Sequence, residues 1–203
     1  MHIDNIDWVE FYSPAFQPRS GAAAFVERVT SLKGPAAAAK IALQQGGRML
    51  WLADRIEEVA AGRDSIQIFF YLIAAEAVAK MVFGFKGEGQ SRGFVRQFFG
   101  EVCLDRHRDC LSRALKLGPA RFLNWSEAVD KLYDVRCDVA HEALHFDFHL
   151  KGDSQGLPRL TGLGLSKTSR GVVAHITLPE LRRLVLEGVL EGVRKLLPSP
   201  SVS

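Results

Sequence analysis

The stretch IQIFFYLIAAEAVAKMVFGF, residues 66–85, is the most apolar of the chain and decides how the rest must be arranged. It is long enough to cross a bilayer, but Glu76 lies in its middle and Lys80 follows one helical turn later. Each of these charges costs roughly 2–3 kcal/mol or more inside a membrane helix. We therefore predict that this stretch is the central helix of a folded domain, and we expect no membrane partner.

Helical periodicity extends on both sides of this central segment. Gly46-Gly47 weakens the upstream pattern and leaves open whether one helix or two form there. Downstream, Ser126 is placed to cap a helix, and the capping box Thr177-Leu-Pro-Glu180 opens the last one. The helices predicted outside the central segment cover residues 35–62, 91–99, 101–117, 126–144 and 178–197.

The period of the pattern changes from 3.6 to 2 at residues 145–150, where polar and apolar side chains alternate. A second alternating run, GVVAHIT at 171–177, indicates a partner strand. The predicted fold is mainly α, a helical bundle with a small β-hairpin before the C-terminal helix. We expect an N-terminal arm (1–34), one helical domain (35–197) and a disordered tail (198–203).

Composition supports a single soluble globular domain. The chain has 203 residues, of which 47% are hydrophobic and 24% charged, which excludes disordered and solenoid architectures. Three cysteines without CxxC spacing and a polar, acidic N-terminus predict a reducing, cytoplasmic compartment. The net charge of +3 permits a nucleic-acid partner only if the basic residues cluster.

Two charges break the binary pattern. Arg136 falls inside the apolar arc of the predicted helix at 126–144, and Glu76 is isolated within the central helix. A charge removed from water costs several kcal/mol unless a partner compensates it. We therefore predict a Glu76–Arg136 pair across two packed helices. The pair is either a structural ion pair or a device that orients the guanidinium toward a phosphate.

His141, five residues after Arg136, is of a type suited to proton transfer near neutral pH. Five helical steps separate the two side chains by about 140° around the helix. They can converge only through the long arginine stem, a fraying helix end or a second protomer. A solvated or capping histidine is the alternative interpretation.

The stretch LYDVRCDVAHE (132–142), preceded by YLIAAEAVAK (71–80) and GEGQSRGFVRQFF (87–99), resembles the HEPN superfamily, in particular its Apea-like branch. The signature of that superfamily is Arg, four to six residues, then His, and Arg136 and His141 fit it with four intervening residues. The resemblance covers about residues 48–197. In active members the residue after the arginine is usually polar, whereas here it is Cys137, with Asp138 following.

The resemblance implies a helical bundle that dimerises with its motif helices together and, in many members, cleaves RNA without a metal or other cofactor. His141 would take the proton of the RNA 2′-OH, and Arg136 would stabilise the charge on the phosphoryl oxygens. Glu76, Cys137 and Asp138 would support them. Other members bind RNA or a partner protein without cleaving, so a non-catalytic dimeric module, with a regulatory protein partner, is the alternative.

Positive charge for RNA binding is concentrated in one segment. Residues 86–121 contain eight Lys/Arg and four Asp/Glu, a local excess of +4. A basic segment of this kind is typical of phosphate-backbone contacts, although it is also typical of a solvated helix face. The predicted RNA contacts are Arg92, Arg96, Arg106 and Arg108.

A second motif overlaps the first. The stretch from His141 to His145, with Glu142 between them, spells HExxH, the signature of zinc metallopeptidases. The change of period at residue 145 argues against both histidines lying on one continuous helical turn. We keep the zinc hydrolase as a second alternative and predict no metal.

Overall fold

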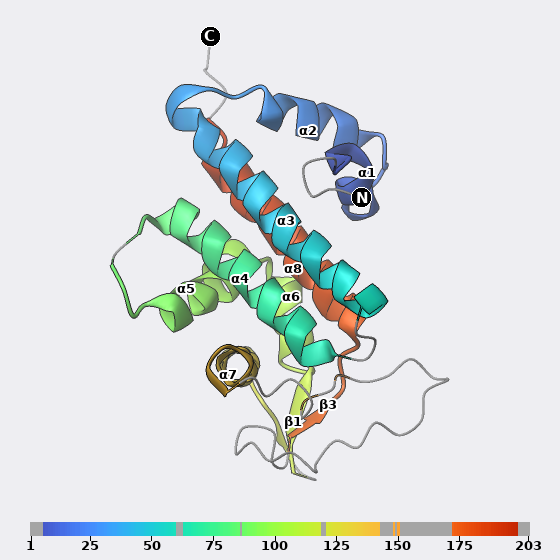
Figure 1. The fold of residues 1–203 in the computed structure, drawn as a ribbon, viewed down its shortest axis with the longest axis vertical. Coiled ribbons are helices and arrows are strands. Elements are labelled where there is room, and N and C mark those ends of the chain that lie inside the picture. Colours follow the sequence, from blue (N-terminus) through green and yellow to red (C-terminus); the bar gives the residue numbers. More distant parts are fainter. Residues whose placement is uncertain are drawn as a thin grey trace.

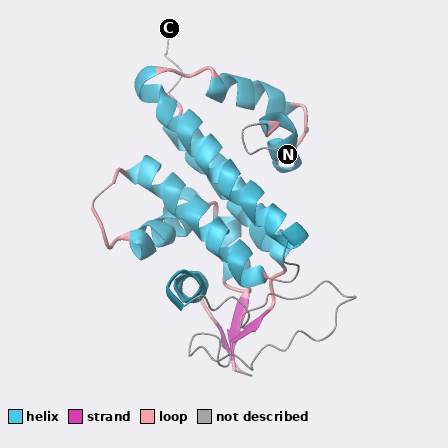
Figure 2. Ribbon diagram, viewed as in Figure 1, coloured by secondary structure: helices cyan, strands magenta, loops and turns pink. Residues whose placement is uncertain are grey.

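The computed structural model describes residues 6–59, 63–85, 87–118, 121–142, 148, 150 and 172–198. Its helices are α1 (Trp8–Tyr12), α2 (Gly21–Thr30), α3 (Ala37–Val59), α4 (Asp64–Phe83), α5 (Ser91–Gln97), α6 (Asp105–Leu111), α7 (Trp125–Glu142) and α8 (Leu178–Leu196), with 3-10 turns η2 (Ser13–Ala15) and η3 (Gly34–Ala36) and a π-helix η4 (Phe98–Val102). The strands are β1 (Leu115–Leu117), β2 (Arg121–Phe122) and β3 (Val172–Ala174). The predicted mainly α fold is confirmed (Figures 1 and 2).

Helix α4 is the centre of the fold. It packs against α3, α7, α8 and α5, and Ile68, Leu72 and Val78 are fully or almost fully buried. By length and hydropathy α4 passes the test for a membrane span, but half of that window is buried inside the protein. Helix α4 is thus the central helix of the described core.

Helix α3 is continuous, so the glycine pair does not divide it. A Cβ at Gly46 would lie 2.8 Å from Cγ1 of Val189 on α8, closer than side chains can approach. A Cβ at Gly47 would lie 2.6 Å from Oη of Tyr12. The glycines are therefore sites of close packing between α3 and its neighbours, and the burial they permit compensates their low helix propensity.

The described part of the predicted N-terminal arm lies against α3 and α8 (Figure 1). The buried hydroxyl of Tyr12 donates a hydrogen bond of 2.7 Å to the carbonyl of Leu43. Val26 and Val29 of α2 belong to the same hydrophobic core as α4. The guanidinium of Arg182 lies 5.5 Å from the ring centroid of Phe11. Residues 6–34 thus share their core with the rest of the protein.

The sheet has the antiparallel order β2-β1-β3. The prediction of a helix over 101–117 was wrong at both ends, since η4 continues to Val102, α6 begins only at Asp105 and residues 115–117 form the central strand. Leu115 pairs with Ala174, so the partner of the GVVAHIT strand is β1. The predicted strand 145–150 lies, apart from Phe148 and Leu150, outside the described residues.

The last helix begins as predicted. The Thr177 hydroxyl accepts a bond of 3.3 Å from the Glu180 N–H, and the Glu180 carboxylate accepts one of 2.7 Å from the Thr177 N–H. This reciprocal capping satisfies two backbone donors that a helix start otherwise leaves unpaired. Of the predicted tail, residues 199–203 lie outside the described part of the chain.

Candidate functional site

Helices α4 and α7 bring Glu76 and Arg136 together. Arg136 lies one helical turn after Leu132, which is fully buried, so its side chain emerges on the face of α7 that packs on α4. Its Nη2 is 3.6 Å from Oε2 of Glu76, and the predicted pair is therefore present. This distance is that of an ion pair rather than of a hydrogen bond.

The Glu76 carboxylate has closer partners. It accepts a hydrogen bond of 2.7 Å from the Ser91 hydroxyl and lies 2.6 Å from Nζ of Lys80. Its side chain is only 10% exposed. One buried carboxylate thus faces two cations, Lys80 and Arg136, and the immediate cluster retains one positive charge.

The Arg136 guanidinium is enclosed by aromatic rings. It lies 5.3 Å from the ring centroid of Tyr133 and 5.9 Å from that of Phe69, distances typical of cation–π contact. Its Nε is buried and has no hydrogen-bond partner among the described residues, and the side chain is 19% exposed. A guanidinium has five N–H donors; the buried Nε is closed to solvent, so an anion that enters from solvent would meet the exposed part of the side chain.

His141 does not join Arg136 within one chain. It is the penultimate residue of α7 and is exposed, about 140° around the helix from the arginine. Cys137 and Asp138 lie between them and are half-buried, and the Cys137 side chain packs against the hydrophobic core. The arrangement places a cation and an imidazole on different sides of one helix.

Two of the predicted RNA contacts form a ladder of ion pairs between α5 and α7. Arg92 Nη2 lies 2.5 Å from Asp134, and Arg96 makes a two-pronged pair with Asp130 at 2.7 and 2.5 Å. Sequence analysis counted the basic residues of 86–121 but did not predict these partners. The signal was present, since both the arginines and the aspartates are spaced four residues apart, the spacing of one helix face.

The other two predicted contacts are also engaged. Arg106 pairs with Glu187 of α8 at 2.9 Å. Arg108 donates a 2.7 Å bond to the Gly100 carbonyl and also pairs with Asp105. The excess of positive charge in the segment is therefore balanced largely by carboxylates of α7 and α8, which the local charge count did not include.

Sequence analysis missed a buried histidine–carboxylate pair. His107, only 4% exposed, places Nε2 2.8 Å from the Glu187 carboxylate, while its Nδ1 accepts a 3.3 Å bond from the Leu104 N–H. Burial acts to raise the pKa of Glu187, but hydrogen bonds from Arg183, His107 and Arg106 outweigh it and hold that pKa at about 2. The pair borders a pocket of about 220 Å³.

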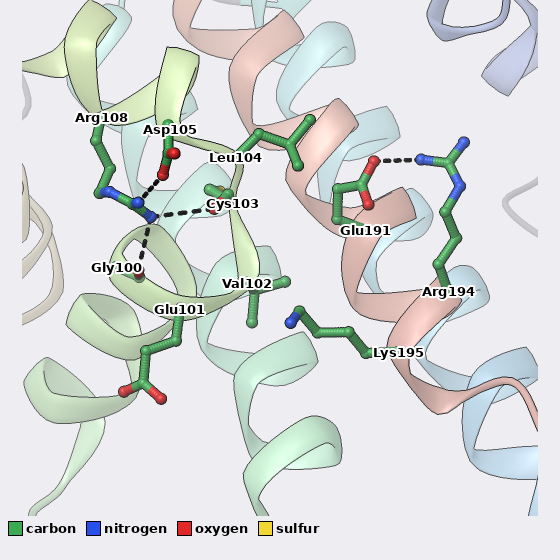
Figure 3. Close-up of a pocket in the computed structure, with 10 residues that line it drawn as sticks. All are labelled: Gly100, Glu101, Val102, Cys103, Leu104, Asp105, Arg108, Glu191, Arg194 and Lys195. Atoms are coloured by element: carbon green, nitrogen blue, oxygen red, sulfur yellow. Dashed lines mark hydrogen bonds and ion pairs between the residues drawn. The ribbon is translucent and has the colours of Figure 1, made fainter.

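A larger hollow of about 540 Å³ lies between the π-helix η4 and the end of α8 (Figure 3). Most of the charged side chains that line it form ion pairs, Arg108 with Asp105 and Arg194 with Glu191. Lys195 extends from α8 toward Val102. The Cys103 thiol behind this wall is buried, and burial raises its pKa well above the ordinary range.

The described residues contain no cluster of three or more His, Cys, Asp and Glu side chains placed to hold a metal ion. The HExxH alternative falls at the edge of what the structure describes. Helix α7 ends at Glu142, whose side chain is not described, and His145 lies outside the described residues.

Comparison of the chain with protein-family models, with curated proteins and with solved structures gives no match. The function must therefore be argued from the chemistry of the residues themselves.

Proposed function

We propose that this protein is a metal-independent endoribonuclease of the HEPN type, with Arg136 and His141 as its catalytic residues. The observation that carries the proposal is the state of Arg136. Its Nη2 lies 3.6 Å from Glu76 Oε2, its side chain is 19% exposed, and among the described residues its Nε has no hydrogen-bond partner. A cation in this state can receive a phosphate without first breaking a tight salt bridge.

The proposed reaction uses a nucleophile that RNA itself contains. Neutral His141 removes the 2′-OH proton, the 2′-oxygen attacks the adjacent phosphorus, and the bond from phosphorus to the 5′-oxygen breaks. A second, protonated imidazole returns a proton to the leaving 5′-oxygen. Arg136 stabilises the negative charge that grows on the phosphoryl oxygens. The products are a 2′,3′-cyclic phosphate and a 5′-hydroxyl.

The same proposal requires two chains. Because His141 and Arg136 diverge by about 140° on α7, one protomer does not close the site. A homodimer supplies the second imidazole and allows the arginine of one chain to work with the histidine of the other. We place the activity in the cytoplasm, since all three cysteines are free, as expected in a reducing compartment.

The test is cleavage of total RNA by the purified protein in the presence of EDTA. We expect cleavage to persist with chelator, to fall by at least about 100-fold in His141→Ala and Arg136→Lys, and to be unchanged in the control Arg28→Ala, an exposed arginine of α2. A DNA oligonucleotide of a cleaved sequence should remain intact. RNA that stays uncleaved by folded wild-type protein at stoichiometric concentration would overturn the proposal.

The divergence of Arg136 and His141 within one chain favours a second candidate, a non-catalytic dimeric module that binds RNA or a regulatory protein. Arg92 and Arg96 are already paired with aspartates, as in a structural surface. In that case His141→Ala leaves RNA binding intact and no cleavage is seen with any variant. RNA affinity that does not fall with added salt would exclude the RNA-binding form of this module.

A further inference from the structure

The small sheet presents one of its two faces to solvent. Residues paired directly across antiparallel strands point to the same side, and successive residues of a strand alternate between sides. Leu115 and Ala174 are such a pair and both are buried, so their side is the core face. Lys116 lies opposite Phe122 on β2 and opposite Val173 on β3, so these three share the other face. The sheet and α2 lie at opposite ends of the molecule (Figure 1).

Two aromatic rings meet on this solvent face. Phe122 is large and apolar, yet it is 44% exposed. Its ring centroid lies 5.1 Å from that of His175, which is also exposed and follows Val173 by two residues. The two ring planes are inclined at 61°, so neither ring covers the other face to face. An exposed π-face of this kind is what an unpaired nucleic-acid base stacks on.

The same face carries positive charge, and its described residues include no carboxylate. Nζ of Lys116 lies 5.6 Å from the ring centroid of Phe122, and Lys116 forms no ion pair within the described part of the chain. Arg113 is exposed, is likewise unpaired there, and precedes the residue whose carbonyl accepts a 2.7 Å bond from the His175 N–H. Arg121 does not add to this charge, because a carboxylate of α7 neutralises it.

We propose that the solvent face of the sheet binds single-stranded RNA, with a base stacked on Phe122 beside His175 and the adjoining phosphate on Lys116. The bases of a single strand match the rings, and its anionic backbone matches the unpaired cations. The choice of RNA over DNA rests on the proposed function, whereas the stacking surface does not.

This surface is separate from the proposed catalytic residues. Phe122 lies three residues before α7 begins at Trp125. His141 lies 16 residues after Trp125, which is about 24 Å along the helix axis at 1.5 Å per residue. The sheet would therefore hold the strand at a distance from the bond that is cleaved.

The test is binding of a fluorescently labelled single-stranded oligoadenylate to the full chain, measured by fluorescence anisotropy. The 2′-hydroxyls of this probe are methylated, so the proposed cleavage reaction has no nucleophile. Phe122→Leu removes the ring but keeps an apolar side chain, and it should raise the Kd by about 5- to 100-fold. Phe122→Trp keeps a ring and should bind within about twofold of wild type. The probe should also quench the added indole.

Phe85→Leu is the matched control. Phe85 is 65% exposed and its ring centroid lies 5.5 Å from Nζ of Lys80, but that lysine is already paired with Glu76. The Kd of this variant should equal that of wild type. Lys116→Gln should raise the Kd and reduce the slope of log Kd against log salt by about 0.7, the share of one phosphate contact in a single strand. Phe122→Leu should leave that slope unchanged.

Equal Kd values for wild type and Phe122→Leu, or an equal loss in Phe85→Leu, would overturn the proposal and leave the face to a protein partner. Wild-type affinity for a duplex of the same sequence would also overturn it, since paired bases do not expose their faces. Should Phe122→Leu fail to fold, Lys116→Gln decides, and an unchanged salt slope rejects the surface. Cleavage is scored separately: protein that binds the probe through Phe122 but leaves total RNA intact keeps the surface and rejects the nuclease.

Discussion

Replacing Glu76 by glutamine removes the buried negative charge between α4 and α7 while preserving the shape of the side chain. The variant retains an acceptor for the Ser91 hydroxyl but leaves Lys80 and Arg136 without their counter-ion. Breaking a fully buried ion pair costs about 3–5 kcal/mol. The Lys80 side chain is 32% exposed and that of Arg136 19%, so both cations regain some hydration. We expect a loss of about 2 kcal/mol in the free energy of unfolding.

The assay is urea denaturation. For Glu76→Gln the urea concentration at the midpoint of unfolding should fall, and the m-value, the dependence of the unfolding free energy on urea, should be unchanged. Glu58→Gln is the matched control. Its side chain is 61% exposed and pairs with Arg55, so its removal should cost less than about 0.5 kcal/mol. A double-mutant cycle between Glu76→Gln and Arg136→Met should give a coupling of about 1 kcal/mol. Equal midpoints for Glu76→Gln and Glu58→Gln, or zero coupling, would refute the reasoning.

Three further predictions, which use four substitutions, test other parts of the fold. Gly188→Ala should lower the free energy of unfolding by about 1–3 kcal/mol, because the new Cβ would lie 2.6 Å from Cζ of Phe98. Gly93→Ala has open space around it and should stabilise α5 by about 0.5–1 kcal/mol. Thermal unfolding compares the two variants, and equal shifts of their melting temperatures would contradict the packing. The pKa of Glu187 is lowered from 4.5 to about 2. Its ionised carboxylate therefore contributes fully to the free energy of unfolding above pH 4.5, and this contribution is lost as the pH falls toward 2. The free energy of unfolding should fall by about 3 kcal/mol over this pH range. Denaturation at a series of pH values measures this pH dependence, which Glu187→Gln should weaken. An unchanged pH dependence in Glu187→Gln would contradict the role of this carboxylate. Thr177→Ala should lower the unfolding free energy by about 1 kcal/mol through loss of the helix cap, and an unaltered denaturation midpoint would contradict that role.

The sequence predicted the parts of the fold that depend on local pattern. Helix α4 followed from its apolar composition, the start of α8 from its capping box, and the Glu76–Arg136 contact from two charges misplaced in apolar surroundings. Each of these signals can be recognised within a single helix and its cap.

The missed features depend on contacts between distant segments. Residues 115–117 have too few positions to show a strand period, and they form β1 only because Leu115 pairs with Ala174. Gly46 gave the same local signal as a helix break but is used for close packing on α8. The acidic partners of Arg92 and Arg96 lie on α7, outside the segment whose charge was counted.

The ion-pair ladder resists a slide of α7 along α5 in one direction. A shift of one turn, about 5.4 Å, that brought Arg92 to Asp130, which it already approaches at 3.8 Å, would place Arg96 opposite Ser126 and leave it without an acid. A shift of one turn in the opposite direction would bring Arg96 to Asp134 and Arg92 to Asp138, so both arginines would keep an acidic partner. Because Arg136 lies two residues beyond Asp134, the ladder therefore limits axial displacement of this guanidinium along α4 in one direction only.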